Sequence, residues 1–300
     1  MRIVSLLPAA TEIVAALGAL DRLVGVTHEC DYPAALLGSR ARVTSSAVDA
    51  GATAGALDAQ VRALAGQGAS LFTLDERTIA ALRPDVVVTQ ALCDVCAVSE
   101  TDVRALAARL TPTPAVVTLS GTTLDGVFAD IERVAAALDL RDEGEELLDG
   151  LRARVRRVHE TLKAAHAPRP RVAVIEWTDP VYAAGHWVPE MVRRAGGVDV
   201  LARAGEHSVE RAVSDVAAGD PEVLVFAPCG YDATRAAVEA RRTLALPEWR
   251  WAAGRPAWAI DANGLVSRPG PRLVDGIEVL AGVMHPELFG TPSGERAIQI

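Results

Sequence analysis

The sequence is poor in cysteine, aromatic residues and basic charge, and each shortage narrows what the protein can be. Only four cysteines and 4 % aromatic residues occur among 300 residues, so the core must consist mainly of alanine, valine and leucine. The net charge of −9 argues against a nucleic-acid partner, because binding to phosphates requires a basic surface. The one basic run, residues 152–159, follows an acidic run, and this order complements the dipole of a helix.

A long apolar run is also missing from the N-terminal segment. The opening MRIVSLLPAATE reaches a proline and polar residues well before the ~20 apolar residues that a membrane span requires. We therefore expect no membrane span and no signal peptide. The sequence as written predicts a cytoplasmic protein with reduced thiols, or a periplasmic or cell-surface protein if a leader has been removed.

Catalytic signatures are absent as well. The sequence contains no phosphate-binding loop, no Gly-x-Ser-x-Gly nucleophile turn and no metalloprotease helix. We therefore expect a binding protein rather than an enzyme.

Short β-branched runs alternate with amphipathic segments, which is the pattern of an α/β fold. Strands are predicted at residues 2–6, 23–27, 70–74, 86–90, 115–119, 171–177, 222–228 and 256–262. Helices are predicted at residues 9–20, 57–68, 75–84, 99–110, 188–197, 211–220, 233–242 and 271–284. The run at residues 86–88 is the most apolar and predicts an interior parallel strand, buried on both faces.

From residue 124 to about residue 167 the strand signal stops and only helical periodicity remains. Residues 142–166 are predicted to form one long helix. We therefore predict two Rossmann-like α/β lobes, residues 1–123 and 169–300. A helical linker, residues 124–168, contains the single backbone helix between them, and the ligand cleft lies between the lobes.

Polar, aromatic and sulfur-containing residues follow the predicted strands. In an open parallel sheet, ligands bind at the carboxyl ends of the strands, so these segments are the candidate site. They contain His28, Cys30, Asp31 and Tyr32 after one strand, and Cys93 and Cys96 after another. In the second half they contain Tyr182, His186, Trp187, Cys229 and Tyr231.

The cysteines leave three interpretations open. Cys30, Cys93, Cys96 and Cys229 could ligate Zn²⁺ or an iron–sulfur cluster if both lobes close on one point. Cys93 and Cys96 also have the spacing of a redox dithiol, although Asp94 between them opposes a low thiolate pKa. In the third interpretation the thiols are part of a pocket wall.

Several motifs, in order along the chain, resemble the class III periplasmic binding-protein family and its cobalamin-binding branch. RIVSLLPAATEIVAALGALDRLVGVTHECDYP resembles the opening of that family, and IAALRPDVVVTQ its Leu-x-Pro-Asp strand. EWTDPVYAAGHWVPEMVRRAGG and SRPGPRLVDGIEVLAGVMHPE are similar to its C-lobe and closing helix. The resemblance runs over nearly the whole chain.

This resemblance implies a monomeric substrate-binding protein of an ABC transporter, with a permease as partner. The expected ligand is cobalamin, a related corrinoid or another metal macrocycle, and a central cobalt or iron could take His28, His186 or a cysteine thiolate as axial ligand. The residues expected to contact the ligand are His28, Asp31, Tyr32, Gln90, Leu92, Trp177, Tyr182, Gly185, His186, Trp187, Gly230 and Tyr231. The alternative hypothesis is a cytoplasmic metal or iron–sulfur protein that uses the four cysteines.

Overall fold

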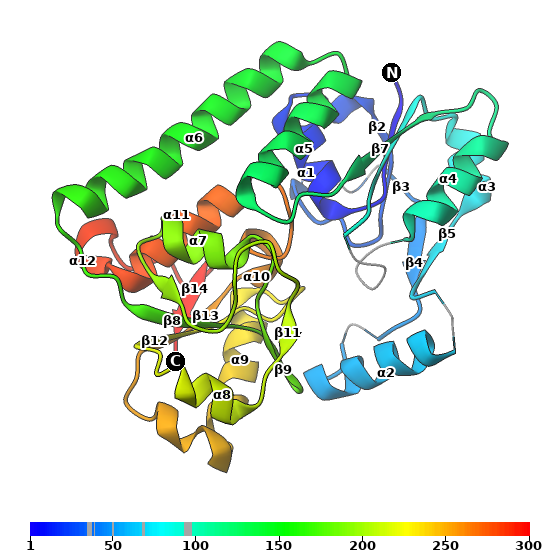
Figure 1. Cartoon of the computed structure of the whole chain (residues 1–300). Coiled ribbons are helices and arrows are strands. Elements are labelled where there is room, and N and C mark those ends of the chain that lie inside the picture. Colours follow the sequence, from blue (N-terminus) through cyan, green and yellow to red (C-terminus); the bar gives the residue numbers. More distant parts are fainter. Residues whose placement is uncertain (35–37, 39, 50, 68–69, 93–97) are drawn as a thin grey trace. The chain divides into compact units, whose positions relative to one another are not determined.

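The computed structural model describes residues 1–34, 38, 40–49, 51–67, 70–92 and 98–300 (Figure 1). This part of the chain forms two compact α/β units. The first unit comprises Met1–Gly121 and Asp125–Gly150, and the second comprises Thr122–Leu124 and Leu151–Ile300. The boundary between Gly150 and Leu151 lies inside the long helix α6 (Arg141–Ala164).

The first unit contains a parallel sheet with the strand order β3-β2-β1-β6-β7. Its strands are β1 (Ile3–Ser5), β2 (Leu23–Val26), β3 (Ala41–Arg42), β6 (Val86–Gln90) and β7 (Ala115–Leu119). Every residue of β6 is buried, and β6 pairs with β1 and β7, which confirms the predicted interior strand. The predicted strand at residues 70–74 is present as β5 (Phe72–Leu74), but it pairs with β4 (Thr44–Ser46) in a separate antiparallel sheet.

Helices flank the first sheet because their apolar sides need a surface to bury. They are α1 (Pro8–Ala16), α3 (Glu76–Leu82), α4 (Glu100–Arg109) and α5 (Leu124–Ala137). The unit also contains α2 (Ala54–Gly66), in which only Ala54 is buried, and a short 3-10 helix η1 (Leu20–Arg22). Helix α1 contacts β1 and β2, and α4 contacts β6 and β7. The Ser99 hydroxyl accepts a hydrogen bond from the Asp102 N–H and so caps the N-terminus of α4.

The second unit contains a mixed sheet in which β8, β12 and β13 are parallel. The strand order is β11-β9-β8-β12-β13-β14, with β10 paired to β8. The strands are β8 (Arg171–Thr178), β9 (Val181–Ala183), β10 (Val198–Asp199), β11 (Val209–Glu210), β12 (Val223–Phe226), β13 (Ala257–Ile260) and β14 (Ala297–Gln299). The sequence did not predict β9, β10, β11 and β14, because runs of two or three residues carry no measurable periodicity.

Helix α9 (Ala233–Leu244) contacts β8, β12, β13 and β14, and it covers the core of the second unit. The other helices are α7 (Val188–Arg194), α8 (Val213–Ala218), α10 (Ala262–Leu265), α11 (Leu273–Met284), α12 (Pro286–Phe289) and the 3-10 helix η3 (Pro247–Ala252). Phe226 and Trp249 are fully buried in this core, with ring centroids 5.9 Å apart.

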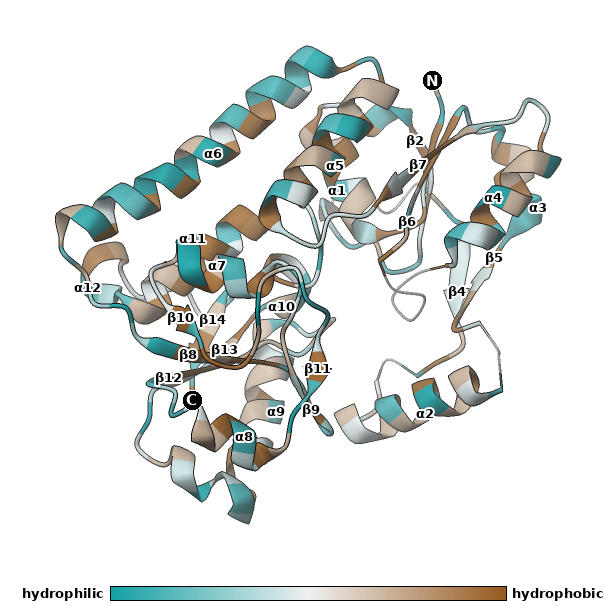
Figure 2. Cartoon of the chain, in the orientation of Figure 1, coloured by the Kyte–Doolittle hydropathy of each residue, from teal (hydrophilic) through white to brown (hydrophobic). Residues whose placement is uncertain are grey.

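Helix α6 is mostly hydrophilic, with apolar residues at regular intervals (Figure 2). The buried residues Leu148, Leu151, Val155, Val158 and Leu162 recur every three or four positions and form one stripe. Asp142 and Glu143 lie in its first turn and Lys163 in its last, so its charges complement the helix dipole. Among the described residues, no helix has both the length and the apolar composition that spanning a membrane would require.

Candidate functional site

In the first unit, the segment that follows β2 is fixed by hydrogen bonds from Arg42. One guanidinium nitrogen of Arg42 donates to the carbonyl oxygens of Thr27 (2.7 Å) and Cys30 (2.9 Å). The Cys30 N–H also donates to the Thr27 carbonyl. These contacts hold the segment at the carboxyl end of β2, where the sequence predicts ligand contacts.

The imidazole of His28 is half-buried at this edge. Its Nδ1 lies 2.7 Å from the Thr44 hydroxyl, and its ring lies beside Phe72 at a centroid distance of 5.8 Å. Burial lowers the pKa of His28 below its ordinary value, and the charge of Arg42 lowers this pKa further. The ring is therefore neutral at pH 7, which is the form that can bind a metal.

Cys30 is buried, and its thiol faces other polar groups of the first unit. Its Sγ lies 3.0 Å from the Thr11 hydroxyl, which in turn donates to the Ser5 hydroxyl at 2.8 Å. The fold therefore accommodates the buried Cys30 thiol, because the Thr11 hydroxyl is its partner. Cys229, in the second unit, is exposed.

The remaining predicted residues of the first unit differ in exposure. Asp31 and Tyr32 are exposed, Leu92 is half-buried, and Gln90 is buried at the end of β6. Cys93 and Cys96 lie outside the described residues. Within the part of the chain that the structure describes, no three His, Cys, Asp or Glu side chains are grouped closely enough to hold a metal ion. The four-cysteine site therefore stays a prediction.

In the second unit, two predicted aromatic residues lie together at the carboxyl ends of neighbouring parallel strands. Trp177 lies near the end of β8, and Tyr231 follows β12. Their rings are arranged edge to face with centroids 5.7 Å apart, and the Arg235 guanidinium lies 3.7 Å from the centre of the Tyr231 ring. Burial raises the pKa of Tyr231, so its hydroxyl is protonated at neutral pH.

The indole N–H of Trp177 is buried and has no hydrogen-bond partner among the described residues. Leaving a buried donor unpaired costs about 1–3 kcal/mol, so such groups are rare in native proteins. An acceptor supplied by a ligand would remove this cost. The indole N–H of Trp251 is also buried without a partner among the described residues, but only that of Trp177 belongs to a predicted ligand residue, so it is the one that indicates a binding site.

Tyr182 lies in β9, which pairs antiparallel with both β8 and β11, and Gly185 and His186 follow this strand. Tyr182 is half-buried and pairs with Trp177 across the two strands. A side chain at Gly185 would place its Cβ 2.4 Å from the Ser208 backbone nitrogen, so only glycine fits there. Burial lowers the pKa of His186, and the neighbouring His207 lowers it further.

Trp187 and Gly230 have local structural functions. Trp187 is buried, and its indole N–H donates to the Val266 carbonyl at 2.8 Å. Gly230 has φ of +78°, a left-handed conformation that glycine adopts without strain, in the turn between Cys229 and Tyr231.

Sequence reasoning missed three polar residues of these edges: Thr44, His207 and Arg235. His207 is 21 positions from His186, and no motif in the sequence connects them. Arg235 follows the capping Asp232 in α9, a spacing that predicts a helix start but not a position over an aromatic ring. Only the folded structure brings these side chains to the predicted residues.

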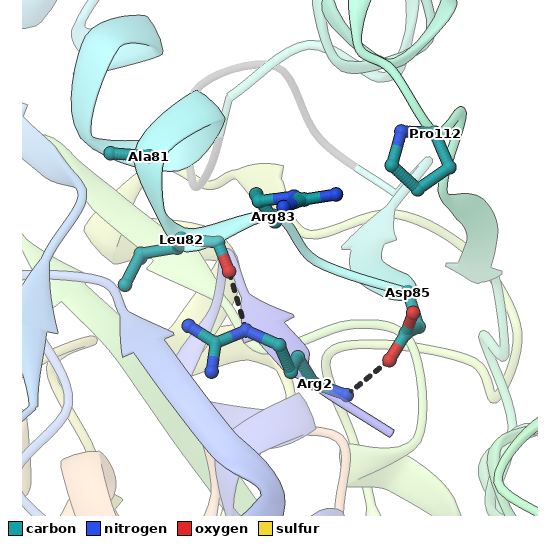
Figure 3. Close-up of a pocket in the computed structure, with 6 residues that line it drawn as sticks. All are labelled: Arg2, Ala81, Leu82, Arg83, Asp85 and Pro112. Carbon is teal, nitrogen blue, oxygen red and sulfur yellow. Dashed lines mark hydrogen bonds between the residues drawn. The ribbon is translucent and has the colours of Figure 1, made fainter.

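A separate open pocket of about 360 Å³ lies at the opposite edge of the first sheet (Figure 3). It is lined by residues that precede strands or end α3: Arg2, Ala81, Leu82, Arg83, Asp85 and Pro112. Arg2 donates from Nε to the Leu82 carbonyl and from its backbone nitrogen to the Asp85 carboxylate, both at 2.6 Å. None of the predicted ligand residues lines this pocket.

The model of the periplasmic binding protein family matches residues 3–247 of the sequence, and the chain belongs to this family. The family consists of solute-binding proteins, so the chain is a binding protein and not an enzyme. A search of curated proteins finds no significant match.

Solved structures with a similar fold cover nearly the whole chain. A periplasmic heme-binding protein from Pseudomonas aeruginosa has a TM-score of 0.69 and 22 % identity, over 96 % of this chain and 93 % of that one. The heme-binding protein RhuT from Roseiflexus sp. RS-1 has a TM-score of 0.66 and 23 % identity, over 95 % and 97 %. The vitamin B12-binding protein BtuF of Vibrio cholerae has a TM-score of 0.65 and 22 % identity, over 94 % and 96 %. These similarities confirm the predicted two-lobe α/β fold.

Proposed function

We propose that this chain is the substrate-binding protein of an ABC-type importer for a metal-containing macrocycle, either a corrinoid such as cobalamin or a heme. The observation that carries the proposal is the Trp177–Tyr231 pair at the carboxyl edge of the second sheet, with its unpaired indole N–H. The similar structures named as heme-binding and vitamin B12-binding proteins support this ligand class.

The chemistry of this edge suits a large flat ligand with a polar rim. Aromatic side chains provide wide apolar contact area for a macrocycle, and a few polar groups fix its orientation. The Trp177 N–H is a donor for a carbonyl, carboxylate or phosphate oxygen. Arg235 adds positive charge beside Tyr231, which favours peripheral oxygen groups of either macrocycle.

The test is an anaerobic visible-absorption titration of the reduced protein with hydroxocobalamin and, separately, with hemin. We expect a saturable spectral change at one ligand per chain for one of the two macrocycles. If neither ligand produces a saturable change, the macrocycle proposal is wrong. A change with hemin alone would replace the cobalamin prediction by heme.

The contribution of the first unit belongs to the same proposal. His28, Asp31, Tyr32, Gln90 and Leu92 are proposed to contact the ligand as well, from the edge of the sheet that contains β2 and β6. Alanine substitution of Tyr32, which is exposed, gives the most direct measure because it disturbs no core packing. The permease partner and the monomeric state also remain part of the proposal.

The metal content of the purified chain discriminates the cysteine alternative. If Zn or iron is present at one or more ions per chain and is lost in Cys93→Ser, the four-cysteine hypothesis gains its main support. If macrocycle binding is unchanged in Cys93→Ser and no metal is present, the thiols are pocket wall or inert.

A further inference from the structure

Two histidines of the second unit form a close pair, although the sequence predicts a ligand contact for only one of them, His186. The Nε2 atom of His186 lies 3.2 Å from the Nδ1 atom of His207. The rings are perpendicular, with centroids 5.0 Å apart. His186 is half-buried between this partner and Trp187, whereas His207 is exposed.

The backbone holds both imidazoles in place through bonds between the two segments. The His186 N–H donates to the Glu206 carbonyl at 2.6 Å, and the Gly205 N–H donates to the His186 carbonyl at 2.8 Å. The residues adjacent to the two histidines are linked as well, because the Gly185 N–H donates to the Ser208 hydroxyl at 3.1 Å. The pair is therefore set by main-chain contacts and not by the rings alone.

The Ser208 hydroxyl is itself anchored, since it donates to the Glu176 carboxylate at 2.7 Å.

His186 adopts a left-handed φ of +53°. A left-handed conformation is unfavourable for a residue other than glycine and persists only where the surrounding structure imposes it. Such strain is frequent at ligand-binding positions.

We propose that His186 and His207 chelate a divalent transition-metal ion of the Zn²⁺, Ni²⁺ or Co²⁺ type. Zinc–nitrogen bonds are about 2.0–2.1 Å long, so two nitrogens of a tetrahedral site lie about 3.3 Å apart. The observed separation of 3.2 Å matches this spacing. Imidazole is a ligand suited to these metals.

Metal binding replaces the proton that the two nitrogens share. Each ring then carries its proton on the other nitrogen, Nδ1 of His186 and Nε2 of His207, and gives a lone pair to the metal. Among the described residues no third His, Cys, Asp or Glu completes the set. Water or an exogenous ligand therefore occupies the remaining positions, so the site is open.

The test is a Co²⁺ and Zn²⁺ titration of the full chain under anaerobic, reducing conditions. The background carries Cys93→Ser, Cys96→Ser and Cys229→Ser, so that these thiols do not compete for the metal. We expect one ion per chain, with Co²⁺ ligand-field bands and no thiolate charge-transfer band. We expect His207→Ala to weaken affinity at least about tenfold, because it removes one of the two protein ligands and because loss of a mere hydrogen-bond partner of a ligand already costs about 10–100-fold.

His186→Asn is the second variant, because asparagine tolerates a left-handed φ but lacks the imidazole. It also weakens binding at least about tenfold. His159→Ala is the matched control, since His159 is exposed on α6, and it leaves affinity unchanged. Wild-type affinity in both His207→Ala and His186→Asn would overturn the proposal, as would an equal loss in His159→Ala. Macrocycle binding by the same variants is measured in a separate titration, so that a failure of the metal site and a failure of the proposed function are distinguishable.

Discussion

At the scale of single residues, buried polar atoms without partners are the most informative feature of this protein. The Trp177 indole N–H and one Asp199 carboxylate oxygen are both buried without a hydrogen-bond partner among the described residues. Each leaves a desolvation cost that the fold itself does not recover. For the indole N–H, we propose that a ligand supplies the missing acceptor. For Asp199, burial instead raises the pKa of the carboxyl group.

The first prediction separates the ring of Trp177 from its N–H. Trp177→Phe keeps an aromatic wall but removes the donor, so macrocycle affinity falls about tenfold, equivalent to ~1.4 kcal/mol. Trp177→Ala removes the wall too and lowers affinity further. Affinity is measured by visible-absorption titration, with Trp251→Phe as the control for an indole elsewhere in the second unit. Equal affinity in Trp177→Ala and the wild type would show that the wall lies elsewhere.

The second prediction concerns pH and Asp199. One oxygen of Asp199 accepts the N–H groups of Leu201 (2.8 Å) and Ala202 (3.0 Å), while the other is the unpartnered Oδ2 atom. Burial raises the pKa of Asp199 to about 6 from 3.8. Because the folded state binds the Asp199 proton more tightly than the unfolded state does, the contribution of this group to the free energy of unfolding falls as pH rises from about 4 to above 6.

Asp199→Asn keeps an accepting oxygen and removes the charge. The free energy of unfolding of Asp199→Asn therefore increases relative to that of the wild type as pH rises. The increase reaches up to about 3 kcal/mol, at ~1.36 kcal/mol per pKa unit, and is constant above pH 7. Urea unfolding at pH 4, 5, 6 and 8 measures this difference. Asp199→Ala, which loses both accepted bonds, serves as the control. A difference between Asn and Asp that does not change with pH would contradict the assigned cause.

At the scale of elements, α6 is held to α11 within the second unit by one arginine. Arg154 donates from Nε to Glu278 at 2.9 Å, and its Nη2 atom contacts both Asp275 and Glu278. These two acids raise the pKa of Arg154 above its ordinary value. All three side chains are only partly exposed, so the pairs are screened less than surface ion pairs.

The third prediction follows from this network. Arg154→Ala leaves two partly buried carboxylates without their partner and lowers the free energy of unfolding by about 1–3 kcal/mol. Arg157→Ala, exposed on the same helix, changes it by less than about 0.5 kcal/mol. Thermal and urea unfolding give both values. If Arg154→Ala and Arg157→Ala have equal free energies of unfolding, the network does not contribute to stability.

Elements with four or more β-branched or apolar residues were predicted correctly, because their periodicity is local. The strands β6, β7, β8, β12 and β13 and the long α6 belong to this group. The strands β1 and β2 have fewer such residues and were predicted from the longer runs RIVSL and LVGVT that contain them. The strands β9, β10 and β11 did not reach that length, and their pairing partners define them instead. The pairing of β5 with β4 was not predictable for the same reason.

At the scale of the whole molecule, each unit has a core of its own. Val4, Val87 and Leu106 belong to the core of the first unit, whereas Leu224, Phe226 and Trp249 belong to that of the second. Separate cores can open separately, as local stability differs across a structure.

The fourth prediction uses this division. Leu224→Ala in β12 creates a cavity in the second core, at a cost of about 2–5 kcal/mol. Amide hydrogen exchange, read by mass spectrometry, therefore accelerates in β8, β12 and β13 and stays unchanged in β1 and β6. Val87→Ala is the reciprocal control and accelerates exchange in β1, β6 and β7. Equal acceleration throughout the chain in either variant would mean that the chain opens as one cooperative unit.

The sequence by itself determined the α/β class, the acidic character, the family resemblance and the strand ends that carry the candidate residues. Those properties depend on local composition and on spacing along the chain. Only the tertiary structure decided which candidates meet. It paired His186 with His207 through the β9–β11 contact, buried Trp187 against Val266 and placed Arg235 over Tyr231. Contacts between distant positions depend on packing, and no local pattern encodes them.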